Sequence, residues 1–482
     1  MAVQKLIIRY LLDPLAKIMV RIPQKLKNAG FTAFFLWIIF LYMGRGSGLL
    51  KFRYFLFFSL GCVGLGGMIL CSLPAHIKPV MFRKTLIIPW LGIGGLMLFS
   101  GIIYNMDYLP EALLFLVAYP IVFIVWNQSD STKIFKQLLR GIELSFWLYV
   151  LVCLLFYPVK AVRYSGLFTN VNATAGYLAL VAVCLLADCL WFEKFTLRRI
   201  RILIAWGICV ALLLYTGSRT GMLELAATVA VTATMGFIRI GKQRKFHYFR
   251  NLILIVASVL LFFYTTTYVL QLGYRVKLDT IALMQSVFEE KPTATVPGTE
   301  PTVSSTEPTV SPTVPTPPPT TLPVIRPEDS VGVIGDRLDT DGRDLNMFSA
   351  GRIQIWQGYI KQLNLFGHPD SGTVSFHYDG TTRTYHTTHM TIIQVAYENG
   401  IIAGILYLIF NLTAGIYSLL HALRHKDDPY AMIPLMVSVA YGVYSLLANT
   451  GISFWYLGTL MYYLVQFPIM AKPQKIVESE EK

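Results

Sequence analysis

Long apolar segments constrain this chain more than any other feature. Segments of about 20 residues without a charged side chain recur along it, for example Tyr54–Leu73, Thr85–Tyr104 and Ile401–Leu420. A helix of that length matches the hydrocarbon thickness of a bilayer, and a helix satisfies its own backbone hydrogen bonds in lipid. The sequence therefore predicts an all-α polytopic membrane protein. Only 14% of the residues are charged, against about 25% in soluble domains, which favours the same conclusion.

The apolar pattern predicts about twelve transmembrane helices, of which the first is short. We place them at residues 31–43, 54–73, 85–104, 108–126, 141–159, 173–192, 202–215, 221–238, 252–270, 401–420, 431–448 and 452–470.

These helices divide the chain into five parts. Residues 1–30 are basic and amphipathic, which is typical of a helix lying on the membrane surface. A first bundle of about nine helices (31–270) is followed by one large loop (271–400), the last three helices (401–470) and a short tail (471–482). No cleavable signal peptide is expected at the N-terminus.

The distribution of basic residues predicts the orientation. With both termini in the cytoplasm, the inner loops and ends carry 26 Lys and Arg residues and the short outer loops carry six. Such a bias marks the cytoplasmic side, so the loop 271–400 is expected outside. The loop 44–53, with Arg45, Lys51 and Arg53, is the one discordant place. The net charge of +14 is explained in this way, and a nucleic-acid partner is not expected.

The large loop has two parts of different composition. Residues 291–323 are rich in Pro and Thr, which predicts an extended linker without a core. Residues 331–400 are mixed and are expected to form an ordered cap. Within it, AGRIQIWQGYIKQL has helical spacing of apolar residues. HMTIIQVAYENGIIAG predicts a second helix running into the span at residue 401.

Arginines on the outer side are the sharpest local signal. Arg219 lies between two spans in LLLYTGSRTGML, with Gly217 and Gly221 on either side. A cation at this depth is expected to bind an anion or a buried carboxylate, and the alternative is an arginine that snorkels to the interface. Arg163, in the loop KAVRYSGLFTNVN, and Arg352, in SAGRIQIW, are also outside. Guanidinium groups suit phosphate oxygens, so these three arginines can converge on one diphosphate.

Other polar residues of the outer side are more ambiguous. Asn170 and Asn172 follow Arg163 and fit either a binding role or ordinary turn chemistry. His386 and His389 are spaced like metal ligands, but neither a cysteine nor an HExxH pattern accompanies them, and no metal is expected. His389 immediately precedes the apolar helix that returns to the membrane, where a neutral imidazole can act as a general base.

Several function classes are not supported. All six cysteines fall inside predicted spans, so the large loop has neither a disulfide framework nor a Cys-based zinc site. The DTDGRD sequence at Asp339–Asp344 lacks the rest of a calcium loop and is interpreted as a polar turn. The chain has no Walker-type phosphate loop, which argues against an ATP-driven pump, and no cofactor is expected.

Several segments together resemble the bacterial O-antigen ligase and O-antigen polymerase family, including Gram-positive capsule and teichuronic-acid-type polymerases. RYSGLFTNVNATAGYLAL is similar to its Arg-x-x-Gly-x-Phe-x-Asn-x-Asn stretch, and LYTGSRTGML to its Thr-x-Ser-Arg-Gly segment. SAGRIQIW, with Trp356, resembles a Gly-Arg-x-x-x-Trp segment, and LNLFGHPDSG the turn that follows it. HTTHMTIIQVAYENGIIAGIL resembles the His-Asn-x-x-Leu-Gln-x-x-x-Glu-x-Gly-x-x-Gly signature.

The resemblance covers residues 160–420 and has departures. Met390 replaces the usual Asn, Thr220 separates Arg219 from Gly221, and HPDSG is a loose version of the usual turn. These departures leave the choice between polymerase and ligase open.

The resemblance implies a helical lipid-phosphosugar glycosyltransferase of GT-C-like architecture that acts without a metal. The donor would be an oligosaccharide on polyprenyl diphosphate at the outer face of a bacterial plasma membrane, and the acceptor a glycan or lipid-linked glycan. Arg219, Arg352 and His389 would be catalytic. The residues expected to bind substrate are Arg163, Asn172, Trp356 and His386.

A transporter or lipid-glycan flippase is the alternative. Such proteins carry ionisable residues near the midplane and paired repeats, whereas here the interior acids are few (Glu143, Asp188 and Glu224) and the two halves show no repeat. A sensor or scaffold would leave the aligned arginines unexplained.

Overall fold

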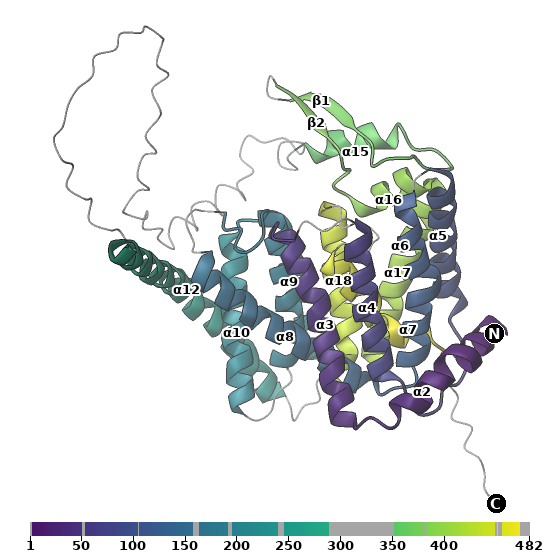
Figure 1. Ribbon diagram of the computed structural model, residues 1–482, viewed down its shortest axis with the longest axis horizontal. Helices are drawn as coiled ribbons and strands as arrows, with labels where there is room; N and C mark the ends of the chain where they lie inside the picture. Colours follow the sequence, from purple (N-terminus) through teal and green to yellow (C-terminus); the bar gives the residue numbers. More distant parts are fainter. Residues whose placement is uncertain are drawn as a thin grey trace, which may run out of the picture.

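The computed structural model is a mostly helical bundle with a small cap at one end (Figure 1). It describes residues 2–50, 54–104, 106–157, 163–190, 195–239, 245–288, 351–378, 381–448, 451 and 456–472. The predicted linker 291–323 and the DTDGRD turn lie outside the described residues.

The first half of the chain forms the N-terminal helices and most of the bundle. Its helices are α1 (Ala2–Ile7), the π-helical turn η1 (Ile8–Leu12), α2 (Asp13–Met19), α3 (Gln24–Gly46), α4 (Tyr54–Ser72), α5 (Lys84–Ile103), η2 (Met106–Tyr108), α6 (Leu109–Leu113), η3 (Leu114–Ala118), α7 (Tyr119–Trp126), α8 (Ser131–Phe156), α9 (Val171–Cys189), α10 (Leu197–Tyr215), α11 (Arg219–Arg239) and α12 (Lys245–Phe288).

The second half forms the cap and completes the bundle. Its elements are α15 (Arg352–Ile360), the strands β1 (Val374–Tyr378) and β2 (Thr381–Tyr385), α16 (Thr391–Asn399), α17 (Ile401–Arg424), η5 (Pro429–Met432), α18 (Ile433–Leu447), α19 (Leu457–Val465) and α20 (Phe467–Met470).

Ten helical segments of the described chain are long and apolar enough to cross a membrane. The protein is therefore a multi-pass, mostly helical membrane protein. Two of the twelve predicted spans do not meet the same criteria of helix length and apolar composition. α10 begins with Arg198, Arg199 and Arg201, and the last predicted span contains only the short α19 and α20 among its described residues. The count of twelve stays a prediction.

Several predicted boundaries differ from the structure. α3 begins about two turns before its predicted span, at Gln24, and α8 about three turns before, at Ser131. α12 continues to Phe288 and has 44 residues, which at 1.5 Å per residue is about 66 Å, roughly twice the thickness of a bilayer core. The predicted span 252–270 is therefore one part of a longer helix, and Figure 1 shows α12 at one edge of the bundle.

An aromatic cluster joins the helices on the side of the bundle below the cap. The Trp90 ring of α5 stacks on Phe115 with centroids 4.4 Å apart, and it meets Phe410 and Tyr463 edge-on at 5.1 and 5.0 Å. Its indole nitrogen donates to the Phe115 carbonyl at 2.7 Å. Because Trp90 is fully buried, this contact holds α5, η3, α17 and α19 in one core.

The cap combines two short helices with a hairpin that the sequence analysis did not predict. β1 and β2 pair antiparallel, with Val374 opposite Tyr385 and Tyr378 opposite Thr381. The two predicted helices are present as α15 and α16. The prediction that the second runs continuously into the membrane is wrong, because the backbone turns sharply at Gly400 (φ 89°). A Cβ there would lie 2.1 Å from the Leu365 carbonyl oxygen, so only glycine fits.

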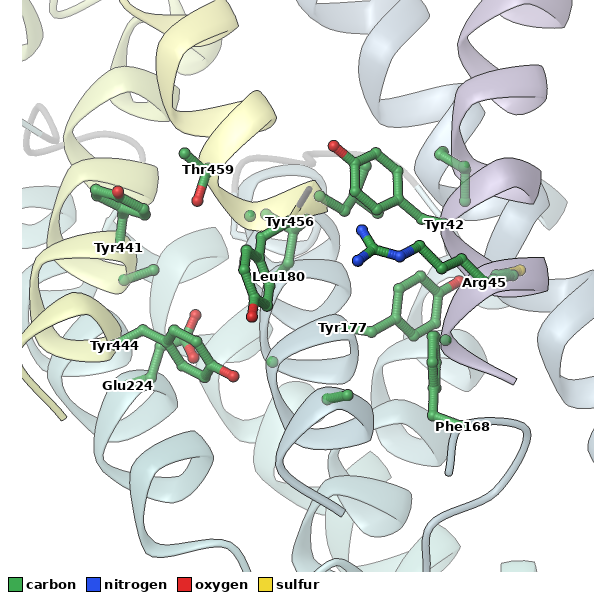
Figure 2. Close-up of a pocket in the computed structure, with 18 of the residues that line it drawn as sticks. Tyr42, Arg45, Phe168, Tyr177, Leu180, Glu224, Tyr441, Tyr444, Tyr456 and Thr459 are labelled. Carbon is green, nitrogen blue, oxygen red and sulfur yellow. The ribbon is translucent and has the colours of Figure 1, made fainter. Parts of the chain in front are cut away.

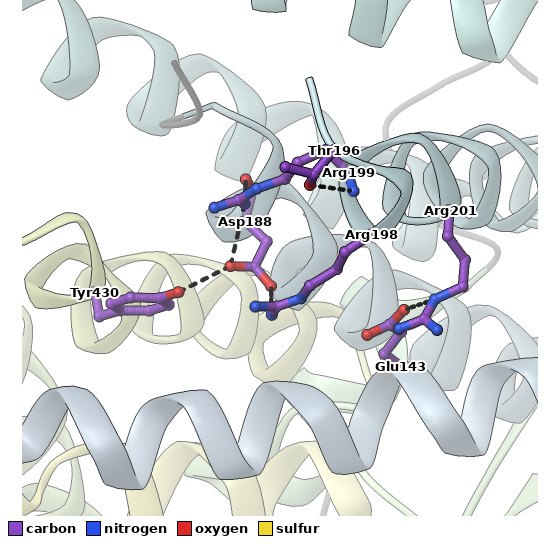
Figure 3. Close-up of polar contacts among 7 residues, drawn as sticks. All are labelled: Glu143, Asp188, Thr196, Arg198, Arg199, Arg201 and Tyr430. Atoms are coloured by element: carbon purple, nitrogen blue, oxygen red, sulfur yellow. Dashed lines mark hydrogen bonds and ion pairs between the residues drawn. The ribbon is translucent and has the colours of Figure 1, made fainter. Parts of the chain in front are cut away.

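Ion pairs join the helices at the end opposite the cap (Figure 3). The buried Asp188 carboxylate of α9 pairs with Arg198 at 3.1 Å and accepts from the Tyr430 hydroxyl at 3.1 Å. The buried Glu143 of α8 accepts from Arg201 at 2.8 Å. The arginines that open α10 therefore satisfy two of the interior acids, so these acids are structural.

Candidate active site

Arg219 is positioned by a tight turn between α10 and α11. Gly217 adopts a left-handed conformation (φ 58°), and the Thr216 hydroxyl accepts the Ser218 backbone N–H at 3.1 Å. The Ser218 hydroxyl in turn donates to the Asn172 side chain at 3.1 Å. Arg219 is then the first residue of α11 and is half-buried. The helix N-terminus adds a partial positive charge to that of its guanidinium.

The loop before α9 lies at the same end of the bundle. The Thr169 N–H donates to the Gly46 carbonyl at 3.0 Å, and the Tyr164 N–H donates to the Tyr215 carbonyl at 2.9 Å. The loop therefore bridges the last turns of α3 and α10.

The cap brings Arg352 close to Arg219. Gly351 takes a left-handed conformation (φ 79°), and Arg352 begins α15 directly after it. Burial lowers the pKa of Arg352 from its ordinary value; Tyr444 opposes this shift and the Arg219 guanidinium adds to it. Two guanidinium groups that repel one another in a half-buried place form a site for an anion.

His389 faces the same charges. It has a left-handed backbone (φ 52°) and is half-buried. Burial, and then the Arg352 guanidinium, lower the pKa of His389 below its usual value. The imidazole is therefore neutral at neutral pH and can accept a proton.

Gln394 holds the segment that carries His389, and the sequence analysis gave it no role. Its side-chain oxygen accepts the Thr388 N–H at 2.9 Å, and its nitrogen donates to Glu398 at 2.7 Å and to the Ser371 carbonyl at 3.2 Å. Glu398 is half-buried, and burial raises its pKa to about 8 while the bond from Gln394 opposes the shift. A glutamine four residues before a glutamate on one helix face was the available signal.

A cavity of about 280 Å³ lies beside these residues, between α3, α9, α18 and α19 (Figure 2). Its walls are mostly apolar and aromatic. Figure 2 shows Arg45 on one side of it and Glu224, beside Tyr444, on the other. The Tyr444 hydroxyl donates to the Asn172 carbonyl at 3.2 Å. Because Tyr444 lines the cavity and also interacts with Arg352, it connects the cavity to the arginine pair.

Two cavity residues were not predicted as site residues. Arg45 was noted only as discordant with the positive-inside rule, and its place on the cavity wall accounts for a cation there. Glu224 is 4% exposed, and one of its carboxylate oxygens has no hydrogen-bond partner within the described chain. Two features of the sequence could have indicated these residues. Arg45 is a basic residue in a loop predicted to lie outside, and Glu224 is an acid inside a span, five residues after Arg219.

The remaining predicted site residues lie in different surroundings. Asn172 is exposed and adjoins the turn that carries Arg219. Arg163 and His386 are exposed. Trp356 is half-buried one turn after Arg352 on the same face of α15, and it packs against the core of the cap. Its indole nitrogen is buried without a partner in the described structure, and is available as a donor.

No group of three His, Cys, Asp or Glu side chains is arranged as a metal site among the residues that the structure describes. His368 has a structural position, since its ring stacks on Tyr397 with centroids 3.9 Å apart and bonds the Tyr397 carbonyl at 2.9 Å.

No family model matches the chain, and no curated protein is significantly similar to it. Its class, a multi-pass and mostly helical membrane protein, therefore comes from the fold alone.

Proposed function

We propose that the protein is a membrane glycosyltransferase that uses a glycan carried on polyprenyl diphosphate. Polymerisation of repeat units is the first choice and ligation to another carrier the second, both in the synthesis of a cell-surface polysaccharide. The observation that supports this best is that Arg352 of the cap interacts electrostatically with Arg219, with His389 and with Tyr444, which lines a mostly apolar cavity. Such a site suits a substrate with a diphosphate, a lipid and a reactive sugar.

The proposed reaction is a displacement at the anomeric carbon. Arg219 and Arg352 hold the diphosphate and stabilise the charge that develops as it leaves. The acceptor hydroxyl loses its proton to His389, and its oxygen bonds to the anomeric carbon as the bond to the phosphate oxygen breaks. The products are the lengthened glycan and the free polyprenyl diphosphate. No nucleotide is needed, because the donor is already activated.

The cavity and Trp356 suit further parts of the proposed substrate. The aromatic cavity next to Tyr444 suits part of the lipid chain, and the indole nitrogen of Trp356 suits a sugar hydroxyl. In this proposal the site faces the outside of a bacterial plasma membrane and both termini are cytoplasmic.

The test is transfer by purified protein from a synthetic lipid-diphosphate donor. Arg219→Ala and Arg352→Ala should each lower the rate about 10²–10³-fold, as expected when one stabilising donor is lost. Arg219→Lys should recover little, because an ammonium does not reproduce the planar fork of a guanidinium. Product is read by gel or mass spectrometry, with membrane insertion checked in parallel.

Arg383→Ala is the matched control, since Arg383 is an exposed arginine of the hairpin. It should retain normal transfer. Near-normal product from Arg219→Ala would make Arg219 a snorkelling residue. Movement of the donor across vesicle membranes without new product would instead support a flippase.

A further inference from the structure

A second pocket, which is polar, lies at the end of the bundle opposite the cap. Its cavity of about 470 Å³ is formed where α5 begins, where α17 ends and where the chain leaves α20. α17 has 24 residues between the cap and this pocket, so the two sites are about 36 Å apart along it. The basic residues that line the pocket are Arg83, His421, Arg424, His425 and Lys472.

The pocket is held together by backbone pairing between distant segments. The Arg83 N–H donates to the Met470 carbonyl at 2.8 Å, and the Lys472 N–H donates to the Met81 carbonyl at 2.8 Å. The Arg83 Nε donates to the Ile469 carbonyl at 2.9 Å. Arg83 and Lys472, 389 positions apart in the sequence, are therefore fixed on one wall.

The pocket is positive without a neutralising acid in its lining, which contains neither Asp nor Glu. The nearest acids in sequence are Asp427 and Asp428, and both interact with Arg239. The side chain of Asp428 also accepts from the Thr132 hydroxyl at 3.1 Å and the Tyr430 N–H at 2.9 Å. The positive charges of Arg83, Arg424 and Lys472 are thus available to an anion that enters the pocket.

The position of the pocket favours a lipid over a dissolved anion. It lies where α5 begins and α17 ends, two helices long and apolar enough to cross a membrane, and Ile88 and Ile416 of these helices are 61% and 59% exposed. The Tyr417 ring lies under the Arg83 guanidinium at 4.6 Å, and its hydroxyl accepts from Thr85 at 3.3 Å. A tyrosine beside basic groups at a helix end is typical of the headgroup region.

We infer that this pocket binds the phosphate headgroup of an anionic phospholipid, with its acyl chains along the exposed apolar faces of α5 and α17. The guanidinium groups of Arg83 and Arg424 suit the phosphate oxygens, and Lys472 adds a point charge. The lipid would fasten the C-terminal segment to the start of α5. This inference does not depend on the proposed glycosyltransferase activity.

The test measures lipid binding by the purified full chain in neutral detergent, by native mass spectrometry and by thermal unfolding. Phosphatidylglycerol should bind and raise Tm, whereas phosphatidylcholine and inorganic phosphate should not. Arg424→Gln with Lys472→Gln should weaken binding of phosphatidylglycerol about tenfold or more, since each surface cation contributes appreciably to attraction of an anionic lipid. Lys133→Gln with Arg140→Gln removes the same charge from exposed sites outside the pocket and should change binding less than about twofold.

Three outcomes would overturn the inference. Equal binding of phosphatidylcholine would mean an unspecific lipid contact, and an equal rise in Tm with inorganic phosphate would mean a site for the free anion. Residues 473–482 contain Glu478, Glu480 and Glu481, whose carboxylates could occupy the basic pocket. The third measurement therefore uses a chain that ends at Lys472. If phosphatidylglycerol bound only to that shortened chain, the acidic tail would be the occupant. Single Arg424→Gln and Lys472→Gln variants serve if the double variant does not fold.

Discussion

His389 has an unusual backbone conformation and an imidazole pKa below its usual value. Its left-handed φ of 52° costs a residue with a Cβ about 1–3 kcal/mol, and such strain persists only where neighbours hold it. Thr388 and Gln394 supply that hold on either side. Because burial and Arg352 act on the imidazole in the same direction, the position favours an uncharged ring beside a fixed cation.

The pH dependence of transfer follows from that lowered pKa. If neutral His389 accepts the proton, transfer should be at its maximum above the His389 pKa and fall as the pH drops through it, with a midpoint below 6.5. His389→Ala should lower the rate about 10²–10⁴-fold and leave donor binding intact, since the donor is held by the arginines. Initial rates against pH, with binding measured separately, provide the check.

His386→Ala is the control for this prediction. His386 is exposed three residues earlier, and its variant should transfer normally. A dead His386→Ala beside an active His389→Ala would move the base by three residues, and two active variants would remove histidine from the mechanism.

Part of this candidate site could be proposed from the sequence. Arg219 and His389 were proposed because each lies beside a predicted span, and Arg352 because it opens a predicted helix of the large loop. Tyr444 could not be proposed in this way, because its role comes from partners on other elements: it lies on α18, donates to the Asn172 carbonyl in the first turn of α9 and lines the cavity.

At the scale of elements, small residues set how closely the helices of the site approach. A Cβ on Gly221 would lie 2.9 Å from the Ala175 Cβ of α9 and 2.9 Å from a methyl of Leu213 on α10. Gly221→Ala should therefore displace α11 and with it Arg219. Overpacking of this kind costs about 1–3 kcal/mol, so we expect a lower Tm and slower transfer, measured by thermal unfolding and by the transfer assay.

Gly415→Ala is the matched control, because no atom lies within 4 Å of a Cβ at that helical position. It should leave activity unchanged and stabilise slightly, by about 0.5–1 kcal/mol. If both variants behaved alike, close packing at Gly221 would not matter for the site.

The Asp188 network makes a second prediction at this scale. Asp188→Ala removes the carboxylate that accepts from the Tyr430 hydroxyl and pairs with Arg198 and Arg199, and should cost about 1–3 kcal/mol. Arg198→Ala should cost less, below about 1 kcal/mol, because Arg198 is 46% exposed. Comparison of the two Tm values checks the order, and an equal or larger loss from Arg198→Ala would contradict it.

The elements themselves were predictable to different degrees. Apolar length is a local property, so most spans can be predicted from the sequence. The predicted span 202–215 leaves out the first turn of α10, whose three arginines pair with Asp188 and Glu143 on other helices. The hairpin was missed because its strands are short and mostly polar, and among the described residues they pair with each other in a two-stranded sheet. The break at Gly400 was missed because its cause is the Leu365 carbonyl of a different segment.

Across the whole molecule the two ends of the bundle differ in chemistry. The cap end combines Arg219 and Arg352 with an aromatic cavity, and the other end combines a basic pocket with the ion pairs of α10. Basic residues at the cap end, which is expected outside, count against the orientation predicted from the distribution of Lys and Arg. Arg45 and Arg219 have positions at the cavity and the candidate site that account for their charge, so the bias of 26 inner to six outer basic residues still favours this orientation.

The orientation is therefore the prediction on which the proposed site depends. In a chain whose six cysteines are replaced, Thr306→Cys should react with an impermeant thiol reagent in intact cells, because the loop 271–400 is expected outside. Ser479→Cys should react only after the cells are opened, since the tail is expected in the cytoplasm. The native cysteines are all free and buried or partly buried, so small replacements are required to keep the bundle packed. Labelling of Ser479→Cys in intact cells, with Thr306→Cys protected, would reverse the orientation. The arginine pair would then face the cytoplasm, where a donor presented outside could not reach it.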